Sequence, residues 1–437
     1  MMTFEAPSDL LNPATRDGAF TQLEGLGVHA LRVVMYWRDV APQANSATKP
    51  DFDTTDPAAY NWGNYDAVVD AANARGWKVV LTVTGPVPKW ATQSKTDQVT
   101  RPKPEEFAPF MAAVGKHFAG RVSVWSIWNE PNHPQFLAPQ FDAKHNPASP
   151  MIYRALYKAA LKGLRSAGLT NPPVLFGETA PRGGGKVVSP LVFLRGALCL
   201  NKSYKLQHGC GALEMAGYAH HAYTTAAGPF FVPPSPNDVT IGVLSRLSKA
   251  LDKAAAAHVI PAGLPIYLTE FGIQSFPDPI SGVSLQRQAE YRAISERIAY
   301  DNPRVHSFSQ YLLTDDKPIA GAKGAAKYGG FESGLKTSKG IVKPSFDAFR
   351  LTLAVKLVTK TTVSVWGLVR PATGATSATL EYRAGTSGVW HTTKTLATNS
   401  LGYFRSRVAY RKDRQYRLVW MSPAGPTYTG AATRAYK

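Results

Sequence analysis

The 437-residue chain is poor in cysteine, in long apolar runs and in acidic residues relative to basic ones. It has two cysteines, and no second Cys/His pair lies near them, which disfavours a metal site. No stretch approaches the ~20 continuous apolar residues that a membrane span requires, so we expect a soluble protein. The 30 Asp and Glu stand against 49 Lys and Arg, which gives a formal net charge of +19.

The positive charge is concentrated near the C-terminus. Residues 355–437 hold 13 Lys and Arg against two acids, a net +11, which leaves +8 for the first 354 residues. Such a segment suits an anionic partner, such as an acidic cell-wall polymer, a membrane surface or a nucleic acid, or is simply a solvated basic surface. No nucleic-acid-binding motif is present, so we expect no nucleic-acid partner.

The two cysteines, Cys199 and Cys210, lie in one short polar segment that is typical of a loop. Two thiols so close in sequence, with none elsewhere, predict one local disulfide and an oxidising compartment. We therefore expect a secreted protein. No signal peptide is visible before the first predicted strand, and we expect that it has been removed.

Stretches typical of strands and of helices alternate along the first 354 residues, as they do in parallel α/β folds. Buried-strand patterns predict eight strands, at residues 1–5, 31–37, 77–84, 122–128, 174–178, 216–221, 265–271 and 305–312. Helical spacing of apolar residues and stop signals such as Gly76 predict helices at residues 15–26, 65–75, 104–118, 151–167, 239–257, 285–300 and 345–353.

Eight strand–helix units favour an α/β fold of the (β/α)8 TIM-barrel type over residues 1–354. The alternative is a doubly wound open sheet, which more often has five to seven strands and a Gly-rich first turn that is missing here. After residue 354 the pattern changes to short alternating stretches separated by Gly, Pro and Ser. Residues 355–437 are therefore predicted to form a small all-β domain, a sandwich.

Two glutamates follow apolar strand runs at positions that a barrel uses for chemistry. Glu130 follows the fourth strand in the sequence W-S-I-W-N-E-P-N, and Glu270 ends the seventh in I-Y-L-T-E-F-G. The C-terminal ends of barrel strands form the active site, so both carboxylates are expected to face one cavity. Cleavage of a glycosidic bond needs such a pair, with one carboxyl protonated and the other ionised.

This arrangement resembles the clan A glycoside hydrolases, cellulase-type barrel enzymes that include families 5 and 39. The resemblance covers residues 1–354 and implies that Glu130 is the acid/base and Glu270 the nucleophile. It also implies that Asn129 binds the sugar 2-hydroxyl and that Arg32 hydrogen-bonds the nucleophile. His221 and Tyr223 match the H-x-Y that often ends strand six in family 5, where the Tyr contacts the nucleophile.

One departure from family 5 lies at strand eight. That strand usually ends in a Trp that forms the floor of the subsite, whereas F-S-Q-Y occupies this stretch here. Gln310 or Tyr311 is expected to take the place of the Trp. The sugar preference and the choice between families 5 and 39 therefore stay open.

Further candidates lie at other strand ends. Trp37 and Trp90 are candidate sugar platforms, because a pyranose ring has an apolar face, although aromatic rings also fill protein cores. Glu178 and Glu5 end strands five and one and are candidate substrate contacts. Trp128 points away from Asn129 in strand alternation and is expected to pack in the core.

The sequence therefore predicts a retaining glycoside hydrolase that acts by double displacement on a glycan or glycoside. The resemblance implies a β-linked or equatorially linked substrate, no cofactor and no metal, and we expect a monomer. A transglycosylase would use the same residues with an acceptor sugar in place of water. A non-catalytic cell-wall glycan-binding protein is disfavoured, because both carboxylates, Asn129 and Arg32 are all intact.

Overall fold

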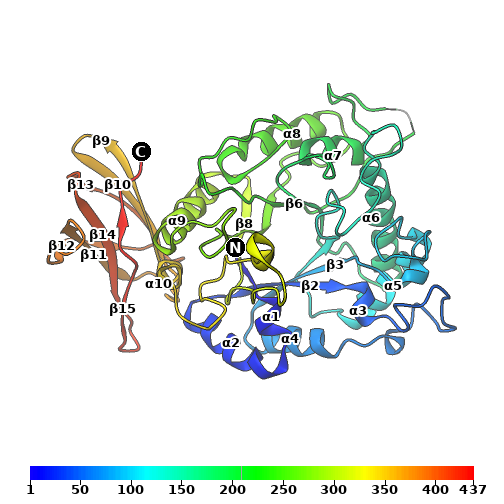
Figure 1. The fold of residues 1–437 in the computed structure, drawn as a ribbon, viewed down its shortest axis with the longest axis horizontal. Coiled ribbons are helices and arrows are strands. Elements are labelled where there is room, and N and C mark those ends of the chain that lie inside the picture. The colour runs from blue at the N-terminus through cyan, green and yellow to red at the C-terminus, as the bar shows by residue number, and fades with distance from the viewer. Residues whose placement is uncertain (208) are drawn as a thin grey trace.

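The computed structural model describes residues 1–207 and 209–437, and its larger part is a closed eight-stranded parallel barrel (Figure 1). Each strand pairs with the next in chain order, and β1 pairs with β8 to close the barrel. The strands are β1 (Met2–Glu5), β2 (Ala30–Tyr36), β3 (Lys78–Thr84), β4 (Val124–Ile127), β5 (Val174–Thr179), β6 (Gly217–His221), β7 (Ile266–Glu270) and β8 (Val305–Tyr311). The predicted (β/α)8 barrel is confirmed.

Burial explains why these segments form strands. The side chains of β5, β6 and β7 are buried along their whole length, and in β2 only Tyr36, at the C-terminal end, is partly exposed. Strands covered on both faces need near-continuous apolar sequence, which is the pattern that predicted them. Charged residues such as Arg32 and Glu270 inside these strands therefore require partners within the barrel.

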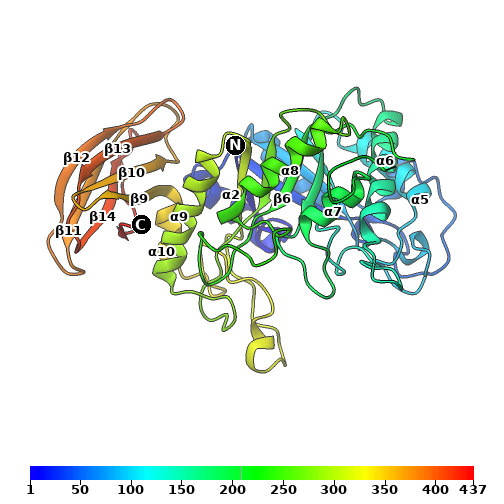
Figure 2. The ribbon, with the colours of Figure 1, turned by 90° about the horizontal axis from the view of Figure 1, so that it is seen from above.

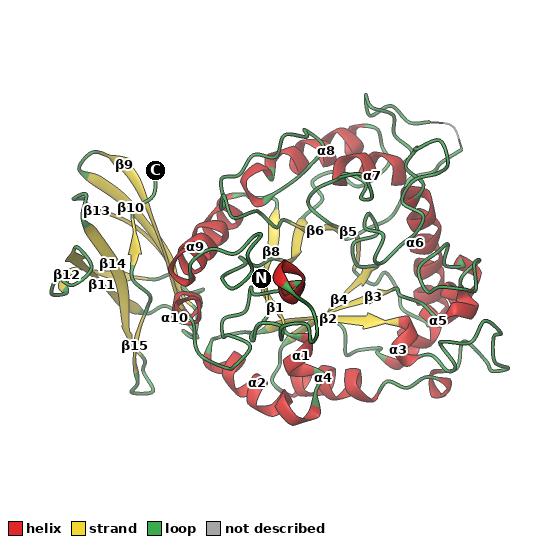
Figure 3. Ribbon diagram, in the orientation of Figure 1, coloured by secondary structure: helices red, strands yellow, loops and turns green. Residues whose placement is uncertain are grey.

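Helices form a ring around the strands (Figure 3). They are α1 (Pro7–Leu10), α2 (Pro13–Gly25), α3 (Trp37–Val40), α4 (Gly63–Ala74), α5 (Pro104–His117), α6 (Ser149–Ser166), α7 (Pro190–Ala197), α8 (Ser245–Ala256), α9 (Leu285–Asp301) and α10 (Pro344–Arg350). Many begin with a proline in the first turn, where a missing N–H costs nothing.

Three details differ from the sequence prediction. Helix α7 was not predicted, because its eight residues are almost entirely apolar and show little polar alternation. The helix expected at 239–257 is a 3₁₀ turn at Ile241–Val243 followed by α8. The helix expected at 345–353 ends at Arg350, because Leu351 and the residues after it pair with β10.

The disulfide between Cys199 and Cys210 is confirmed. Cys199 lies just after α7, and the Cα atoms of the two cysteines are 6.1 Å apart. The bond closes the loop between α7 and β6 on the outside of the barrel, away from the strand ends that carry Glu130 and Glu270.

The C-terminal part consists of antiparallel strands in two sheets. One sheet has the order β13-β10-β9, and the other β12-β11-β14-β15 with β16 also paired to β14. The strands are β9 (Leu351–Thr359), β10 (Thr362–Val369), β11 (Ser377–Ala384), β12 (His391–Ala397), β13 (Tyr403–Ala409), β14 (Arg414–Met421), β15 (Thr427–Thr429) and β16 (Thr433–Arg434).

The two sheets share an apolar core, which includes Val365, Leu380 and Leu418. This core and the paired sheets confirm the predicted all-β sandwich. Strand β9 begins directly after α10, so the domain boundary expected after residue 354 falls inside a strand. We propose that the barrel domain and the sandwich domain meet at the end of α10.

A buried ion-pair network joins the sandwich to the barrel. The sandwich lies against α9 and α10 in both views (Figures 1 and 2). Arg370, which follows β10, donates to both oxygens of Glu296 on α9, at 2.8 and 2.9 Å. Arg292, one turn earlier on α9, donates to the same carboxylate at 2.6 Å. All three side chains are buried, so the cost of removing each charge from water is offset by the opposite charges beside it.

Within the described residues, no helix has both the length and the apolar character needed to cross a bilayer.

The network at Glu296 predicts a large effect on stability. Glu296→Ala leaves two buried guanidinium groups without their carboxylate, so we expect the free energy of unfolding to fall by about 3–5 kcal/mol in urea titrations at pH 7. Asp301→Ala is the matched control, because the Asp301 side chain is 43% exposed, and its pairs with the buried Arg297 and the exposed Arg405 should contribute less than about 1 kcal/mol. Equal losses in the two variants would contradict the network's role.

The same carboxylate predicts a pH dependence. Burial raises the pKa of Glu296, but Arg370 and Arg292 outweigh burial and lower this pKa to about 2. The folded value lies below the unfolded value of about 4.3, so this stabilisation is present above that pH and is lost as the pH falls toward 2. The Glu296→Ala variant should lack this part of the acid dependence.

Candidate active site

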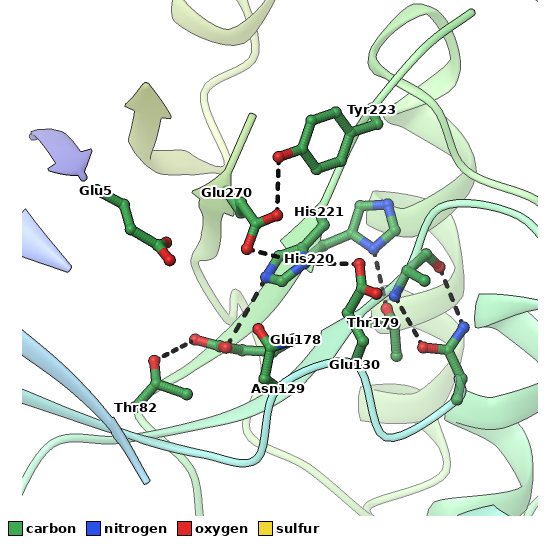
Figure 4. Close-up of polar contacts among 12 residues, drawn as sticks. Glu5, Thr82, Asn129, Glu130, Glu178, Thr179, His220, His221, Tyr223 and Glu270 are labelled. Carbon is green, nitrogen blue, oxygen red and sulfur yellow. Dashed lines mark hydrogen bonds and ion pairs between the residues drawn. The ribbon is translucent and has the colours of Figure 1, made fainter. Parts of the chain in front are cut away.

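Glu130 and Glu270 meet at the C-terminal end of the barrel, on either side of His221 (Figure 4). Nδ1 of His221 lies 2.9 Å from Oε1 of Glu130 and 3.8 Å from Oε2 of Glu270. The β6–β7 pairing causes this contact, because His221 is directly opposite Glu270 in the register. The two carboxylates are 140 positions apart in sequence, and the barrel brings them into one cavity.

Two hydrogen bonds hold the Glu270 carboxylate. Tyr223 donates its phenol proton to Oε1 at 2.7 Å, and Arg32 donates from Nη1 to Oε2 at 2.9 Å. Both oxygens are thus oriented by donors, one of which is charged. Its side chain is 11% exposed, so the carboxylate stays accessible from the cavity.

Arg32 is a fully buried cation that is surrounded by oxygen acceptors. Besides Glu270, its guanidinium contacts the carboxylates of Glu5 and Glu178. It also donates to Oδ1 of Asn129 at 2.6 Å and to Oγ1 of Thr82 at 3.2 Å. Groups from β1, β3, β5 and β7 and from the segment after β4 therefore converge on the Arg32 side chain. These contacts fix the relative positions of the strands.

The backbone of Glu130 is fixed by contacts with the neighbouring strand. The N–H of Glu130 donates to the carbonyl of Glu178 at 3.0 Å. Asn132, two residues later, is fully buried and exchanges hydrogen bonds with the backbone of Ala180. This second Asn of N-E-P-N ties the loop after β4 to the loop after β5, and sequence reasoning had not singled it out.

The pKa shifts place a proton between His221 and Glu130. Burial raises the pKa of Glu130, but the hydrogen bond and charge of His221 outweigh burial and hold this pKa below its ordinary value. Burial lowers the pKa of His221, yet Glu270 and Glu130 outweigh burial and raise it above its ordinary value. Both shifts favour a proton on the imidazole of His221 over one on the carboxyl group of Glu130.

Backbone strain gathers around these residues. Glu130, Glu178 and Trp128 all adopt positive φ angles, of 40°, 47° and 70°. Non-glycine residues pay for this region with about 1–3 kcal/mol each, and such strain is typical of functional sites. The observed hydrogen bonds of the site hold these conformations in place.

His220 and His221 have separate roles, as strand alternation predicts. The imidazole of His220 lies 2.9 Å from Oγ1 of Thr179 and 2.8 Å from the carbonyl of Val239. Both of its nitrogens are engaged behind the strand, in the layer between barrel and helices. His221 alone faces the carboxylates.

Four predicted substrate contacts do not reach the cavity. Trp37 stacks on Phe110 at 4.7 Å between ring centroids and packs edge-on against Trp90, and both indoles are buried in the core between β2, β3 and α5. Neither ring offers a face to a sugar, so the predicted platforms are wrong. The packing of Trp128 is as expected, since it is buried and donates to the carbonyl of Phe136.

Glu178 and Gln310 are the other two corrections. Glu178 is fully buried, and both of its oxygens are engaged, by Arg32 and by Thr82. The amide of Gln310 donates to backbone carbonyls that include that of Ser333, and its oxygen accepts from Arg292. Both side chains therefore bind other protein groups with all of their polar atoms. They support the barrel and do not contact substrate.

Aromatic residues lie near Glu270, although strand eight lacks the Trp that is usual in family 5. The rings of Tyr223 and Tyr311 lie 5.9 and 5.0 Å from that of Phe331, in the loop after β8. Tyr36 closes β2 beside Glu5 and Glu270, whose charges add to burial and raise the pKa of its phenol to about 12. Tyr36 could have been found from its place at a strand end, whereas Phe331 lies in a long loop that carries no such signal.

A pair of carboxyl groups at the C-terminal end of a closed barrel suits the cleavage of a glycosidic bond, and the family comparison agrees. A family model described as cellulase, glycosyl hydrolase family 5, matches residues 2–297. The chain therefore belongs to glycosyl hydrolase family 5, and it is a glycoside hydrolase. No curated protein sequence matches the chain.

Solved structures share the fold. A glucosidase from Croceicoccus marinus superposes with a TM-score of 0.53 at 11% identity, covering 91% of this chain and 90% of that one. A family GH10 endoxylanase retrieved from a sugarcane soil metagenome gives a TM-score of 0.50 at 11% identity, covering 80% of this chain and 96% of that one. At these identities the likeness establishes the barrel fold alone.

The burial of Trp37 predicts a structural effect. Trp37→Ala should lower the free energy of unfolding by about 3–5 kcal/mol, because it opens a cavity in the aromatic core. Trp37→Phe, which keeps most of the stacking area, should cost far less. Neither variant should change KM for a sugar substrate by more than about two-fold when assayed well below its melting temperature. A large rise in KM with unchanged stability would restore the sugar-platform interpretation.

Proposed function

We propose that this family 5 enzyme retains anomeric configuration, with Glu270 as the nucleophile and Glu130 as the acid/base. The observation that carries the proposal is their shared contact with His221. Since the two oxygens lie 2.9 and 3.8 Å from one nitrogen, they are at most about 6.7 Å apart, a limit that covers the retaining separation and reaches only the lower end of the inverting one. Retaining enzymes have carboxyl groups about 5–5.5 Å apart, whereas inverting enzymes need about 6.5–9.5 Å to admit a water.

The reaction proceeds in two displacements. Glu270 attacks the anomeric carbon and forms an ester while the glycosidic bond breaks, and Glu130 gives its proton to the departing oxygen. Glu130, now a carboxylate, then takes a proton from water, and the resulting hydroxide attacks the same carbon. The ester bond breaks, the sugar leaves with retained configuration, and the Glu270 carboxylate is restored.

The neighbours of Glu270 suit a nucleophile. Arg32 and Tyr223 supply two fixed donors, which hold the carboxylate in one orientation. Asn129 is held by Arg32 through its Oδ1, so its amide group remains to bind the sugar 2-hydroxyl. These groups are already in place before substrate arrives, and such preorganisation lowers the barrier most in a water-poor site.

His221 supplies the proton that Glu130 delivers. In the resting site the charge of Glu270 raises the pKa of His221. As substrate displaces water, the proton moves across the 2.9 Å contact to Glu130 and on to the leaving group. Ester formation then removes the charge of Glu270, so His221 loses its strongest reason to hold a proton. Glu130 is left as the base for the second step.

The substrate is a β-linked or equatorially linked glycan, and the role is polysaccharide degradation outside the cell. Family membership supports the glycan, and the Cys199–Cys210 disulfide supports an oxidising compartment. The enzyme is proposed to act as a monomer. Retained-product analysis with and without an added acceptor sugar separates hydrolysis from transglycosylation.

The basic sandwich domain is proposed to hold an anionic cell-wall polymer. On β11 and β14, the guanidinium groups of Arg383 and Arg417 lie 4.7 and 4.1 Å from the ring centre of Trp390. Arg417 is paired with Glu381 at 2.7 Å, while Arg383 donates to the amide oxygen of Gln415. An aromatic ring backed by two cations suits a sugar chain that carries carboxylates.

The role of Glu270 can be tested by chemical rescue. Glu270→Ala should lower kcat on an aryl β-glycoside by about 10⁴-fold or more, because no ester can form. Added azide should restore turnover and give a glycosyl azide of inverted configuration, which proton NMR identifies. Wild-type product should keep its starting configuration. An inverted wild-type product would contradict double displacement.

The role of the His221–Glu130 pair can be tested through pH and leaving group. Glu130→Ala should slow substrates with poor leaving groups far more than those with good ones, as acid assistance requires. In wild type, kcat/KM should fall as the pH rises through the raised pKa of His221, above about 6.5, because the pair then loses its proton.

The His221→Gln variant should move this alkaline limb to lower pH. Glu130 alone would then hold the proton, without the raised pKa of the imidazole. An alkaline limb that stays in place would show that another group donates the proton. Thr179→Val is the matched control, because the Thr179 hydroxyl contacts His220 and Tyr218 behind the strand, and it should leave the limb unchanged.

A further inference from the structure

Two carboxyl groups of the site have no part in the proposed mechanism, and they differ in one respect. Glu178 is inaccessible, and both of its oxygens have partners in Arg32 and Thr82. Glu5 contacts Arg32 through Oε2, while its Oε1 has no hydrogen-bond partner among residues 1–207 and 209–437. The side chain of Glu5 is 6% exposed, between Glu178 at 0% and Glu270 at 11%. Glu5 therefore keeps one acceptor available to the cavity.

Glu5 lies beside the nucleophile and away from the acid/base. Nη1 of Arg32 contacts Oε2 of both Glu5 and Glu270, so these two carboxyls are neighbours. In Figure 4, Glu5 and Glu130 lie on opposite sides of Glu270. A sugar bound with its leaving-group oxygen at Glu130 and its anomeric carbon at Glu270 would extend its ring toward Glu5. The groups that reach Glu5 are hydroxyls remote from the scissile bond.

Two phenols complete this end of the cavity. Burial, followed by the charges of Glu5 and Glu270, raises the pKa of Tyr36, and burial with those same charges raises that of Tyr311. Both phenols thus stay neutral and keep a proton to donate. Burial also raises the pKa of Glu5 to about 8, against the opposing effect of Arg32. A neutral acid and two phenols can each donate and accept, which matches the capacity of a sugar hydroxyl.

We propose that Glu5 binds the hydroxyls at C3 and C4 of a neutral sugar in the subsite of Glu270, and this rests on the proposed glycosidase function. The substrate class is a neutral pyranose with those hydroxyls free. A uronic acid is excluded from this subsite, because its carboxylate would face four buried carboxyl groups with only Arg32 and His221 to offset them. Loss of a hydroxyl leaves a buried polar group unpaired, and sites of this kind discriminate strongly.

The first test uses the wild-type enzyme. The probes are the 4-nitrophenyl β-glucoside, galactoside and mannoside, followed by the 3-deoxy and 4-deoxy analogues and the uronide of whichever is hydrolysed fastest. We expect kcat/KM to fall by about 10- to 100-fold for at least one deoxy analogue and for the uronide. Equal rates on the parent and both deoxy analogues would overturn the proposal.

The second test compares variants. Glu5→Ala should slow the parent by a factor similar to that caused by removing the hydroxyl, and it should slow the affected deoxy analogue little further. Glu178→Gln is the matched control, because the Glu178 side chain is fully buried and binds Arg32 and Thr82. It should slow the parent and the analogues by the same factor. If Glu5→Ala behaves like Glu178→Gln, Glu5 is a support for Arg32 and not a substrate contact.

These outcomes test the role of Glu5 and the proposed glycosidase function separately. An active wild type that ignores the C3 and C4 hydroxyls overturns the role of Glu5 and leaves the glycosidase function standing. A wild type that cleaves neither these glycosides nor any β-linked polysaccharide overturns the proposed function, and the role of Glu5 falls with it. The wild-type comparison needs no variant, so it remains decisive even if Glu5→Ala folds poorly. Glu5→Gln provides a more conservative replacement.

Discussion

The buried guanidinium of Arg32 is the charge on which the rest of the site depends. Moving such an ion out of water costs several kcal/mol unless close partners offset the loss. Here the partners are the carboxylates of Glu5, Glu178 and Glu270, supplied by β1, β5 and β7, and the amide oxygen of Asn129 after β4. Closure of the barrel and assembly of the site are therefore one event, because the strands that pair also bring these groups to Arg32.

This arrangement also divides the carboxyl groups by environment. Glu270 receives a charged donor and a phenol, Glu130 receives only the imidazole of His221, and burial leaves Glu5 with a pKa of about 8. Groups of one chemical type thereby acquire different protonation states within a few ångströms. A separate network around Glu296 locks the sandwich domain to α9 and, through Arg292 and Gln310, reaches the backbone beneath the cavity.

Sequence patterns predicted the barrel because buried strands and amphipathic helices carry strong periodic signals, and these elements lie where expected. The positions of Glu130 and Glu270 at strand ends followed from the same pattern, and the family resemblance added Arg32 inside β2 and Tyr223 just after β6. The errors came from side-chain direction: Trp37 lies one residue past a strand end and points into the helix layer, which periodicity alone does not fix. Phe331 lies in an aperiodic loop, so only the folded chain brings it to the site.

The central claim is that Glu270 becomes covalently bound to sugar during turnover. The direct measurement is mass spectrometry of the enzyme after reaction with the 2-deoxy-2-fluoro analogue of its best aryl β-glycoside, which slows release of the intermediate. The account predicts a mass increase of one fluorosugar, located by peptide mapping on Glu270 and absent from the Glu270→Ala variant. An active enzyme that forms no adduct, or one that carries the sugar on Glu130, Glu178 or Glu5, would contradict it.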